Sequence, residues 1–436
     1  MICGGIGVYL LRSSFASSRT TNIYSCPQVN GSYLTLKLGS KDGDTGQPGE
    51  RCVSAIQWAF STQANQHQIT VTGVFDQATQ SGVINFQRFF RYLKVDGVLT
   101  PTQMTAVTNI FGPFKTDDGR YWGIQIHSVP PTDSQANLVK DLDSAVQLGA
   151  KAVRAPISWR GTEWNAKNQY DQSYVAGNDT LMREAHARNL KVIATIADTP
   201  KWASNGQLWN NPPTNPSDMG DFASYFAGRY KSLDPDTLVA IEVWNEPEIN
   251  NNLISSNVAA SYTAMVKAVY TSVKSGKNSD PSVQILAGAM SYADTSFLSK
   301  LYADNIKGFY DGISFHPYAD GADPANLAVV HSFLGGIQAM HTFQQNSGDT
   351  TAQWITEFGW PTGTSTSAST TQQQATYSAK AFSLMKSLPY VKAGTMYQLR
   401  NQAVDPANPE DNFGVLQNDY TKQPAFATVQ SQLHSQ

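Results

Sequence analysis

Cysteine is almost absent from this sequence. The chain of 436 residues has three, Cys3, Cys26 and Cys52, and none follows Cys52. Thiol catalysis requires cysteine, and zinc sites use cysteine or histidine as ligands. No two histidines in this sequence have the spacing of metal ligands within a motif. We therefore predict that the larger part of the chain works without a metal ion or a reactive thiol.

Charge is also scarce. Asp, Glu, Lys and Arg make up 15% of the residues, below the roughly one quarter that is usual in soluble domains. Asn, Gln, Ser and Thr replace them, which favours a protein that works outside the cytoplasm. The formal net charge is −3 at pH 7, so no basic surplus indicates a nucleic-acid partner. No apolar run reaches the roughly 18 residues of a membrane span.

The first segment, residues 1–39, lacks a clear identity. Residues 4–11, GGIGVYLL, resemble the apolar centre of a signal peptide, but no Lys or Arg precedes them and the nearest base is Arg12. An atypical signal, a start that is not the natural one and a disordered tail all remain open.

Two of the cysteines, Cys26 and Cys52, are candidates for a disulfide. The bond would close a loop of about 26 residues and stabilise the fold by about 3 kcal/mol in the chain-entropy model. Two unpaired buried thiols are the alternative. Given the uncharged, polar composition, we expect the disulfide.

Residues 40–111 contain two similar turns. VTGVF at 71–75 recurs as VDGVL at 95–99, and a helix start rich in Thr and Gln follows each. Gly73 and Gly97 allow the same tight turn. Apolar residues around the turns recur at helical spacing, which predicts a small all-α unit of three helices.

This unit resembles the peptidoglycan-binding-like module of bacterial wall enzymes. The matching residues are Gly49, Val53, Ile56, Gln57, Gly73, Phe75, Thr79, Val83, Phe86, Gln87, Asp96, Gly97 and Thr102. Most of these positions build a core, so a purely structural module and one that binds cell-wall glycan both remain open.

After a linker predicted at residues 112–117, apolar strands alternate with amphipathic helices over residues 118–436. The strands are expected at 121–127, 152–157, 191–196, 238–243, 284–289, 312–316, 352–356 and 393–399. Eight strands, each followed by a helix, predict an α/β fold of the (β/α)₈ TIM barrel type. A doubly wound open sheet is the alternative, but no glycine-rich phosphate loop follows the first strand.

Two acids stand directly after two of these strands. Glu246, in VWNEPE, follows the fourth strand, and Glu357, in WITEFGW, follows the seventh. Catalytic groups of such barrels gather where the strands end, so these two side chains should face each other across the barrel mouth. Two facing carboxylates are what glycoside hydrolysis needs, because one protonates the leaving oxygen and the other attacks the anomeric carbon or activates water. No cofactor is required.

N-E-P after the fourth strand and E-F-G after the seventh, in this order, resemble the retaining (β/α)₈ glycoside hydrolases of clan A. The likeness is to family 39 and its bacterial exopolysaccharide-hydrolase relatives, with family 5 as a neighbour, and it covers roughly residues 118–436. It implies that Glu246 is the acid/base and Glu357 the nucleophile. It also implies that Asn245 binds the 2-hydroxyl of the sugar.

The same resemblance assigns residues around the nucleophile. Arg154, expected at the end of the second strand, matches an arginine beside it, and a plain ion pair in the core is the alternative. His316 and Tyr318, in SFHPY, match the histidine and tyrosine that flank it. His127, after the first strand, either lines the cleft or is a core histidine.

Sugar rings stack on aromatic faces, and several tryptophans fall at or just past strand ends. We expect Trp202 and Trp360 to be stacking platforms. Many relatives place a Trp at the end of the eighth strand as a floor for the sugar, but this chain has YQLR there, which offers Tyr397, Gln398 and Arg400.

Together these features predict a monomeric retaining glycoside hydrolase, extracellular or associated with the cell wall. Its substrate is expected to be a polysaccharide, either a bacterial exopolysaccharide or a cell-wall glycan. A non-catalytic carbohydrate-binding protein on a hydrolase barrel and a peptidoglycan hydrolase are the alternatives.

Overall fold

The computed structural model describes residues 24, 26–29, 32–44, 50–63, 69–89, 93–111, 119–249, 251–276 and 279–434. The chain divides between Arg120 and Tyr121 into two compact units. The apolar stretch at 4–11, Cys3 and the linker predicted at 112–117 lie outside the described residues. None of the helices within the described ranges is long and apolar enough to cross a membrane.

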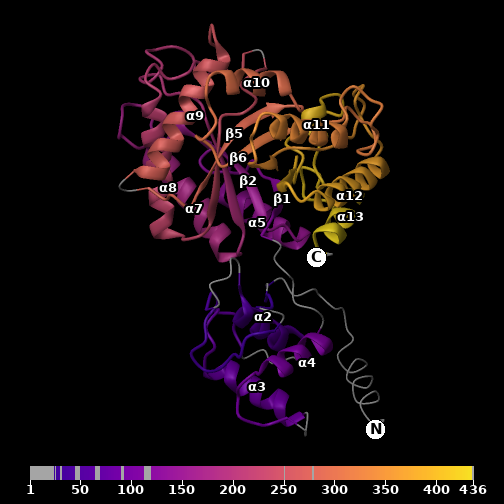
Figure 1. The fold of residues 1–436 in the computed structure, drawn as a ribbon. Helices are drawn as coiled ribbons and strands as arrows, with labels where there is room; N and C mark the ends of the chain where they lie inside the picture. The colour runs from indigo at the N-terminus through magenta and orange to yellow at the C-terminus, as the bar shows by residue number, and fades with distance from the viewer. Residues whose placement is uncertain are drawn as a thin grey trace. The chain divides into compact units, whose positions relative to one another are not determined.

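The first unit is helical in its described part. It contains α2 (Cys52–Trp58), the short π-helix η1 (Ala59–Gln63), α3 (Gln77–Phe89) and α4 (Pro101–Phe111), as Figure 1 shows. Val53, Ile56 and Phe86 belong to its buried core. Cys26 and Cys52 are both buried and form the expected disulfide, which links the start of α2 to the preceding segment.

The repeated turns of this unit are each held by a buried glutamine. Gln57 Oε1 accepts a hydrogen bond from the amide of Gly73 at 3.0 Å, and Gln87 Oε1 accepts one from the amide of Gly97 at 2.9 Å. Each Nε2 also donates to the carbonyl of the residue after the glycine, at 2.9 Å in both cases. The φ angles of the two glycines are 71° and 72°, a region that favours residues without Cβ. The repeated sequence therefore forms the same turn, with the same hydrogen bonds, at both places.

The second unit is a closed barrel of eight parallel strands that follow one another in sequence order. The strands are β1 (Tyr121–Gln125), β2 (Ala152–Ser158), β3 (Lys191–Ala197), β4 (Leu238–Val243), β5 (Gln284–Ser291), β6 (Gly312–His316), β7 (Ala352–Ile355) and β8 (Val391–Met396). The predicted (β/α)₈ fold is confirmed, and the open sheet is excluded.

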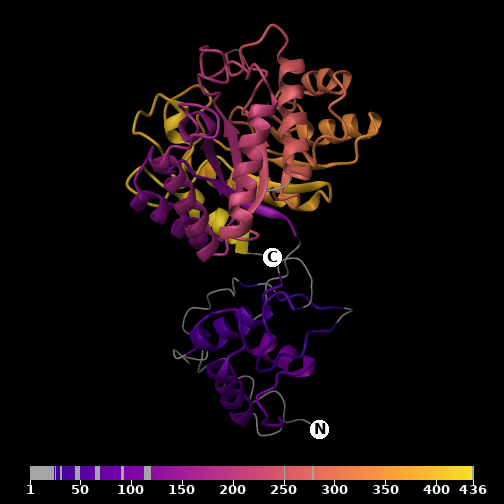
Figure 2. The same ribbon diagram turned by 90° about the vertical axis from the view of Figure 1, so that its left-hand side faces the viewer.

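Helices surround these strands (Figures 1 and 2). They are α5 (Gln135–Leu148), α6 (Trp159–Thr162), α7 (Gln172–Ala187), α8 (Ser217–Leu233), α9 (Val258–Ser275), α10 (Thr295–Ala303), α11 (Phe333–Asn346), α12 (Thr371–Ser387), the 3₁₀-helix η2 (Pro409–Asn412) and α13 (Pro424–His434). Parallel strands buried on both faces read as continuous apolar runs, which is why the sequence revealed them.

Side chains alternate between the two faces of each strand, and this alternation builds the barrel interior in layers. Outward residues such as Val153 and Ile241 belong to the large core shared with the helices. The inward residues nearest the strand starts form a separate apolar floor. This floor consists of Ala152, Ile193, Ala240, Leu286, Trp354 and Ala393.

Two residues further along four of these strands, the inward layer is polar. Arg154 in β2, Thr195 in β3, Glu242 in β4 and Thr395 in β8 are all buried there. The apolar floor closes the barrel below them. The polar layer therefore forms the base on which the residues at the strand ends rest.

Candidate active site

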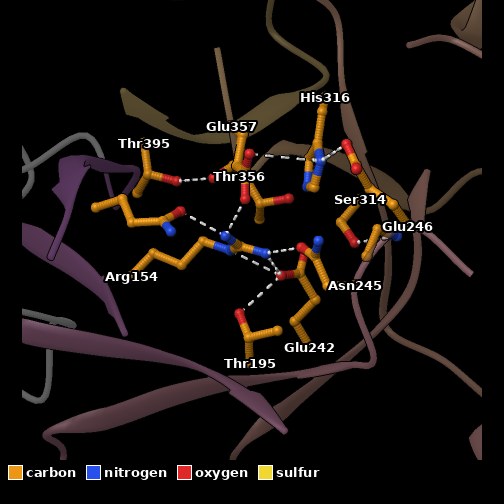
Figure 3. A network of polar contacts seen from close by, with 12 residues as sticks. Arg154, Thr195, Glu242, Asn245, Glu246, Ser314, His316, Thr356, Glu357 and Thr395 are labelled. Carbon is orange, nitrogen blue, oxygen red and sulfur yellow. Dashed lines mark hydrogen bonds and ion pairs between the residues drawn. The ribbon is translucent and has the colours of Figure 1, made fainter. Parts of the chain in front are cut away.

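A cavity of about 870 Å³ opens at the carboxyl ends of the strands. Arg154, Asn245, Glu246, Tyr318 and Glu357 are among the residues that line it. These side chains come from four strands or the loops after them, so the barrel brings together residues up to 203 positions apart in sequence. Figure 3 shows the central contacts.

The turn after β4 orients the side chains of Asn245 and Glu246. Trp244 and Glu246 have φ angles of 68° and 45°, in the left-handed region, which costs roughly 1–3 kcal/mol for a residue with Cβ. Neighbouring strands hold the turn in place. The amide of Trp244 donates to Ile196 O of β3 at 2.9 Å, and that of Glu246 donates to Ala289 O of β5 at 2.7 Å. The strained turn thus follows directly from the end of β4 and carries Asn245 and Glu246 into the cavity.

Glu357 lies almost fully buried just past β7. Arg154 Nη1 donates to its Oε1, and the Tyr318 hydroxyl donates to its Oε2 at 2.7 Å. Burial raises the pKa of Glu357, but the charges of His316 and Arg154 and the bond from Tyr318 outweigh it and hold the pKa below the ordinary value. The carboxylate is therefore kept ionised, as a nucleophile requires.

Arg154 uses all five of its N–H donors. Nε and Nη2 donate to Glu242 Oε2 at 2.8 and 2.6 Å, and Nη2 also donates to Asn245 Oδ1 at 2.8 Å. Nη1 donates to Gln125 Oε1 and to Glu357. The guanidinium is an ion-pair partner in the barrel core and a neighbour of Glu357 at once, so both interpretations of this residue hold. It lies within β2 and not at the end of that strand, which corrects the expected position.

Glu246 contacts a buried histidine. His316 Nδ1 lies 2.9 Å from Glu246 Oε1 and 3.8 Å from Glu357 Oε2, and in Figure 3 the imidazole stands between the two acids. Burial lowers the pKa of His316, but the carboxylates of Glu357 and Glu246 raise it above the ordinary value. The imidazole can therefore carry a positive charge shared by both acids.

A carboxylate oxygen of Glu246 and one of Glu357 lie within 4.8 Å of each other. Retaining glycosidases hold their carboxyl groups about 5–5.5 Å apart, whereas inverting enzymes need about 6.5–9.5 Å to admit a water molecule. The spacing therefore fits the retaining geometry.

Glu246, His316 and Glu357 are also residue types that bind metal ions, and their possible ligand atoms all lie within 4.8 Å of one another. However, Glu357 already contacts the guanidinium of Arg154, and that positive charge opposes the approach of a cation. The cluster is better suited to proton transfer and to carboxylate chemistry than to holding a metal.

Asn245 and His127 both line the cavity. Asn245 Oδ1 accepts from Arg154, which fixes the amide and leaves Nδ2 as the group that can donate to a ligand. Burial lowers the pKa of His127 to about 4, although the nearby charge of Glu357 opposes the shift. His127 is therefore a neutral cavity residue, which decides between its two earlier interpretations.

The prediction that Trp202 and Trp360 are sugar platforms is wrong. Trp360 is 1% exposed, packs in the main core and donates its indole N–H to Ala322 O at 2.8 Å. Trp202 is only partly buried, but it packs on the core and donates to Glu163 O at 2.6 Å, and it does not line the cavity. In both, a backbone carbonyl satisfies the indole nitrogen and the ring packs against the barrel.

Tyr397 takes the place after β8 where many relatives have a tryptophan. It lines the cavity, meets the ring of His127 edge-on at 5.6 Å, and donates its hydroxyl to Glu410 Oε2 at 3.0 Å. The other two residues considered in YQLR do not line the cavity. Gln398 is fully buried, and Arg400 donates to Asp141 and Ser128.

Several cavity residues carried no signal in the sequence. They are Tyr174, Asp198, Tyr292, Asp320, Glu410 and Phe413. Tyr174 lies on α7 and Glu410 in the short 3₁₀-helix η2, and the others lie in loops or short turns after the strands, where no periodic pattern marks which side chains face inward.

Comparison with known proteins identifies the families of the two units. Residues 117–392 match the family of cellulases, glycosyl hydrolase family 5, and residues 49–107 match the peptidoglycan binding domain family. No curated protein matches the chain. The predicted resemblance to clan A hydrolases and to the peptidoglycan-binding-like module is thus confirmed.

Solved structures with the same fold include family 39 glycoside hydrolases. That of Bacteroides cellulosilyticus WH2 has 19% identity and a TM-score of 0.58, covering 74% of this chain and 65% of that one. The family 39 enzyme of Xanthomonas axonopodis pv. citri has 15% identity, a TM-score of 0.53 and coverage of 71% and 65%. A family 39 β-xylosidase of Caulobacter crescentus has 17% identity, a TM-score of 0.51 and coverage of 72% and 71%. This chain thus spans just under two thirds of the first two structures.

The hydrogen bond from Tyr318 to Glu357 generates a prediction about pH. The Tyr318→Phe variant removes one of the contacts that lower the pKa of Glu357, so this pKa rises. An attacking carboxylate must be ionised, so we expect activity to be lost at a higher pH as the solution is acidified. We expect the acid limb of the kcat/KM profile for an aryl glycoside to move to higher pH, and its plateau to fall roughly 10- to 100-fold.

Tyr310→Phe is the matched control, because it removes a hydroxyl that binds Asp349 at 2.9 Å and does not line the cavity. Its acid limb should coincide with that of the unaltered protein. An acid limb that stays in place in Tyr318→Phe would contradict the assignment of Glu357 as the group that must be ionised.

Proposed function

This chain belongs to glycosyl hydrolase family 5, and from that premise we propose that it hydrolyses glycosidic bonds of a polysaccharide by retaining double displacement. Glu357 is the nucleophile and Glu246 the acid/base. The observation that carries the proposal is the pair of carboxylates within 4.8 Å of each other, set in different surroundings. Arg154 and Tyr318 bind Glu357, whereas Glu246 contacts only the imidazole of His316 among the hydrogen bonds of described side chains.

In the first step, a carboxylate oxygen of Glu357 attacks the anomeric carbon and the bond to the leaving oxygen breaks. Glu246 gives its proton to that oxygen, so the leaving sugar departs as an alcohol. As the charge of Glu357 is consumed in the new ester bond, the positive charge of Arg154 remains beside it, balanced by Glu242. Asn245 Nδ2 donates to the 2-hydroxyl of the sugar.

In the second step, Glu246 is ionised and removes a proton from a water molecule. The resulting hydroxide attacks the anomeric carbon from the face that the leaving group vacated. The ester bond breaks and Glu357 recovers its negative charge. Two inversions give net retention, and the enzyme returns to its first protonation state without a cofactor.

The charges in the cavity favour neutral or amino sugars over uronic acids. Five acids line it: Asp198, Glu246, Asp320, Glu357 and Glu410. Among the described lining residues, the only basic side chains are Arg154 and His127. All N–H donors of Arg154 are occupied and His127 is neutral at pH 7, so neither can pair with a substrate carboxylate.

The small helical unit is proposed to hold the enzyme on its polymer. Its match to the peptidoglycan binding domain family supports a role at a cell wall or a related polysaccharide. The disulfide between Cys26 and Cys52 fits a protein that works in an oxidising compartment outside the cytoplasm. A secreted monomer with residues 40–111 as a binding module and residues 118–436 as the catalytic domain accounts for these features.

The roles of the two acids can be separated with azide. Glu357→Ala should lose turnover, and azide should restore it with inverted configuration, because the small anion fills the space of the missing carboxylate. Glu246→Ala should still cleave aryl glycosides with good leaving groups, which need no proton, and azide should then give a product of retained configuration.

Glu184→Ala is the control, since Glu184 lies on α7 and pairs with Arg188 outside the cavity. The configuration of each azide product is read by proton NMR. If the two variants gave the opposite configurations, the roles of Glu246 and Glu357 would be exchanged.

Substrate charge gives a further prediction. At pH 7 we expect kcat/KM for aryl uronides to be at least about 100-fold below that for the matching neutral glycosides, because none of the described residues that line the cavity offers a free cation to the buried carboxylate. The methyl ester of the uronide is the matched control, since it has nearly the same shape without the charge. It should recover most of the loss. A uronide cleaved faster than its neutral counterpart would contradict the proposed substrate class.

Removal of residues 1–111 tests the module. Hydrolysis of a soluble aryl glycoside should change by less than about twofold, because both acids lie in a barrel with its own core. Co-sedimentation with purified cell walls or insoluble polysaccharide should fall strongly. Equal sedimentation of both proteins would show that the module is structural.

Release of reducing sugar from purified walls, compared with exopolysaccharide, separates a peptidoglycan hydrolase from the proposed enzyme.

A further inference from the structure

Tyr292 and Asp320 line the cavity, although neither belongs to the catalytic group described above. Tyr292 directly follows β5, and Asp320 lies in the loop after β6. Their φ angles are 54° and 47°, in the left-handed region that costs roughly 1–3 kcal/mol for residues with Cβ. Two strained residues side by side at a cavity wall suggest that their orientation matters to what binds there.

His331 and Asp320 fix the ring of Tyr292 from two directions. The imidazole of His331 stacks on the tyrosine ring, with centroids 3.9 Å apart and planes at 22°. The Tyr292 hydroxyl donates to Asp320 Oδ1 at 3.0 Å, and His331 Nδ1 lies 2.5 Å from Asp320 Oδ2. One face of the ring is covered by His331 and its tip is tethered, which leaves the other face for the cavity. We call Tyr292, Asp320 and His331 the rim triad.

The rim triad stands on the Glu246 side of the cavity. The end of β5 is tied to the turn that carries Glu246 by two hydrogen bonds, from the Glu246 amide to Ala289 O at 2.7 Å and from the Ser291 amide to Glu248 Oε1 at 2.5 Å. The backbone of Tyr292 also pairs with that of His316, whose imidazole contacts Glu246.

This side of the cavity receives the leaving group. Glu246, as the acid, must reach the glycosidic oxygen, and the sugar beyond that oxygen is the one that departs. Burial, the bond to Asp320 and the nearby charge of Glu246 raise the pKa of Tyr292 to about 12, so its hydroxyl remains a donor at neutral pH.

We propose that the rim triad is the subsite for the first sugar of the leaving group. The open face of Tyr292 stacks on the apolar face of that sugar, and the carboxylate of Asp320 accepts a hydrogen bond from one of its hydroxyls. His331 is a positioning residue that holds the ring of Tyr292 from behind. This inference rests on the proposed function, because the assignment of the leaving-group side depends on Glu246 as the acid.

Two substrates that share the cleaved sugar but differ in leaving group separate this role from others. β-D-Glucosyl fluoride releases fluoride, which is too small to reach the rim triad, whereas cellotetraose releases a sugar. In Tyr292→Ala the ratio of kcat/KM for cellotetraose to that for the fluoride should fall about tenfold. Tyr292→Phe keeps the ring and should lose no more than about threefold.

Tyr170→Ala is the matched control. Tyr170 is also partly buried and stacked on another ring, that of Tyr225 at 3.8 Å, but it does not line the cavity. Its substrate ratio should equal that of the unaltered protein. An unchanged ratio in Tyr292→Ala, or an equal loss on both substrates, would overturn the subsite.

Calorimetric titration with cellotetraose, with every protein carrying the Glu357→Ala change that stops turnover, gives a readout of binding alone. The Kd should rise about tenfold in Tyr292→Ala and stay constant in Tyr170→Ala. If Tyr292→Ala showed this rise in Kd but the unaltered protein cleaved neither substrate, the proposed hydrolysis would be contradicted. The contact between Tyr292 and the sugar would still be supported. Cleavage with an unchanged ratio and an unchanged Kd would overturn the subsite alone.

Discussion

The buried guanidinium of Arg154 is the constraint on which the site depends. It lies inside the barrel, where burying an unpaired charge would destabilise the fold by several kcal/mol. Residues that neutralise this charge must therefore lie next to it. Glu242 pairs with it from within β4, Glu357 from beyond β7, and Asn245 accepts its remaining Nη2 donor. One side chain on β2 thus sets the positions of Glu357, the proposed nucleophile, and of the Asn245 amide that is proposed to bind the sugar. Since every donor is occupied, it also leaves no cation for a charged substrate.

The same network gives the two acids proposed to be catalytic, Glu246 and Glu357, unequal surroundings. Glu357 receives the guanidinium and a tyrosine hydroxyl, which favour its ionised form, whereas Glu246 is placed by a strained turn and contacts only His316 among the described side chains. Two carboxylates within 4.8 Å of each other repel when both are ionised, and the contacts of Glu357 favour its ionised form. The hydrogen bonds that support the turn of Glu246 come from β5, and β5 continues into Tyr292. In the proposed mechanism, the placement of the acid and the binding of the departing sugar therefore depend on the same strand, β5.

Much of this fold could be read from the sequence because its strands are buried on both faces and appear as apolar runs that end in polar residues. Glu246 and Glu357 were found for the same reason, since each directly follows such a run. Trp360 was misjudged because an apolar ring near a strand end gives the same signal whether it faces a cavity or the core. Tyr292 was missed because its role depends on loop geometry and on His331, which lies far away in the sequence. Periodic patterns locate strands, whereas the directions of side chains in loops are set by tertiary contacts.

The central claim is that Glu357 forms a covalent bond to the sugar. An activated 2-deoxy-2-fluoro glycoside of a sugar that the protein cleaves slows the second step more than the first, so the glycosyl-enzyme accumulates. Mass spectrometry of the digested protein then identifies the labelled residue. The account predicts one glycosyl group on the peptide that contains Glu357 and none on the peptide that contains Glu246. A label on Glu246, or turnover of the unmodified glycoside with inverted configuration, would contradict it.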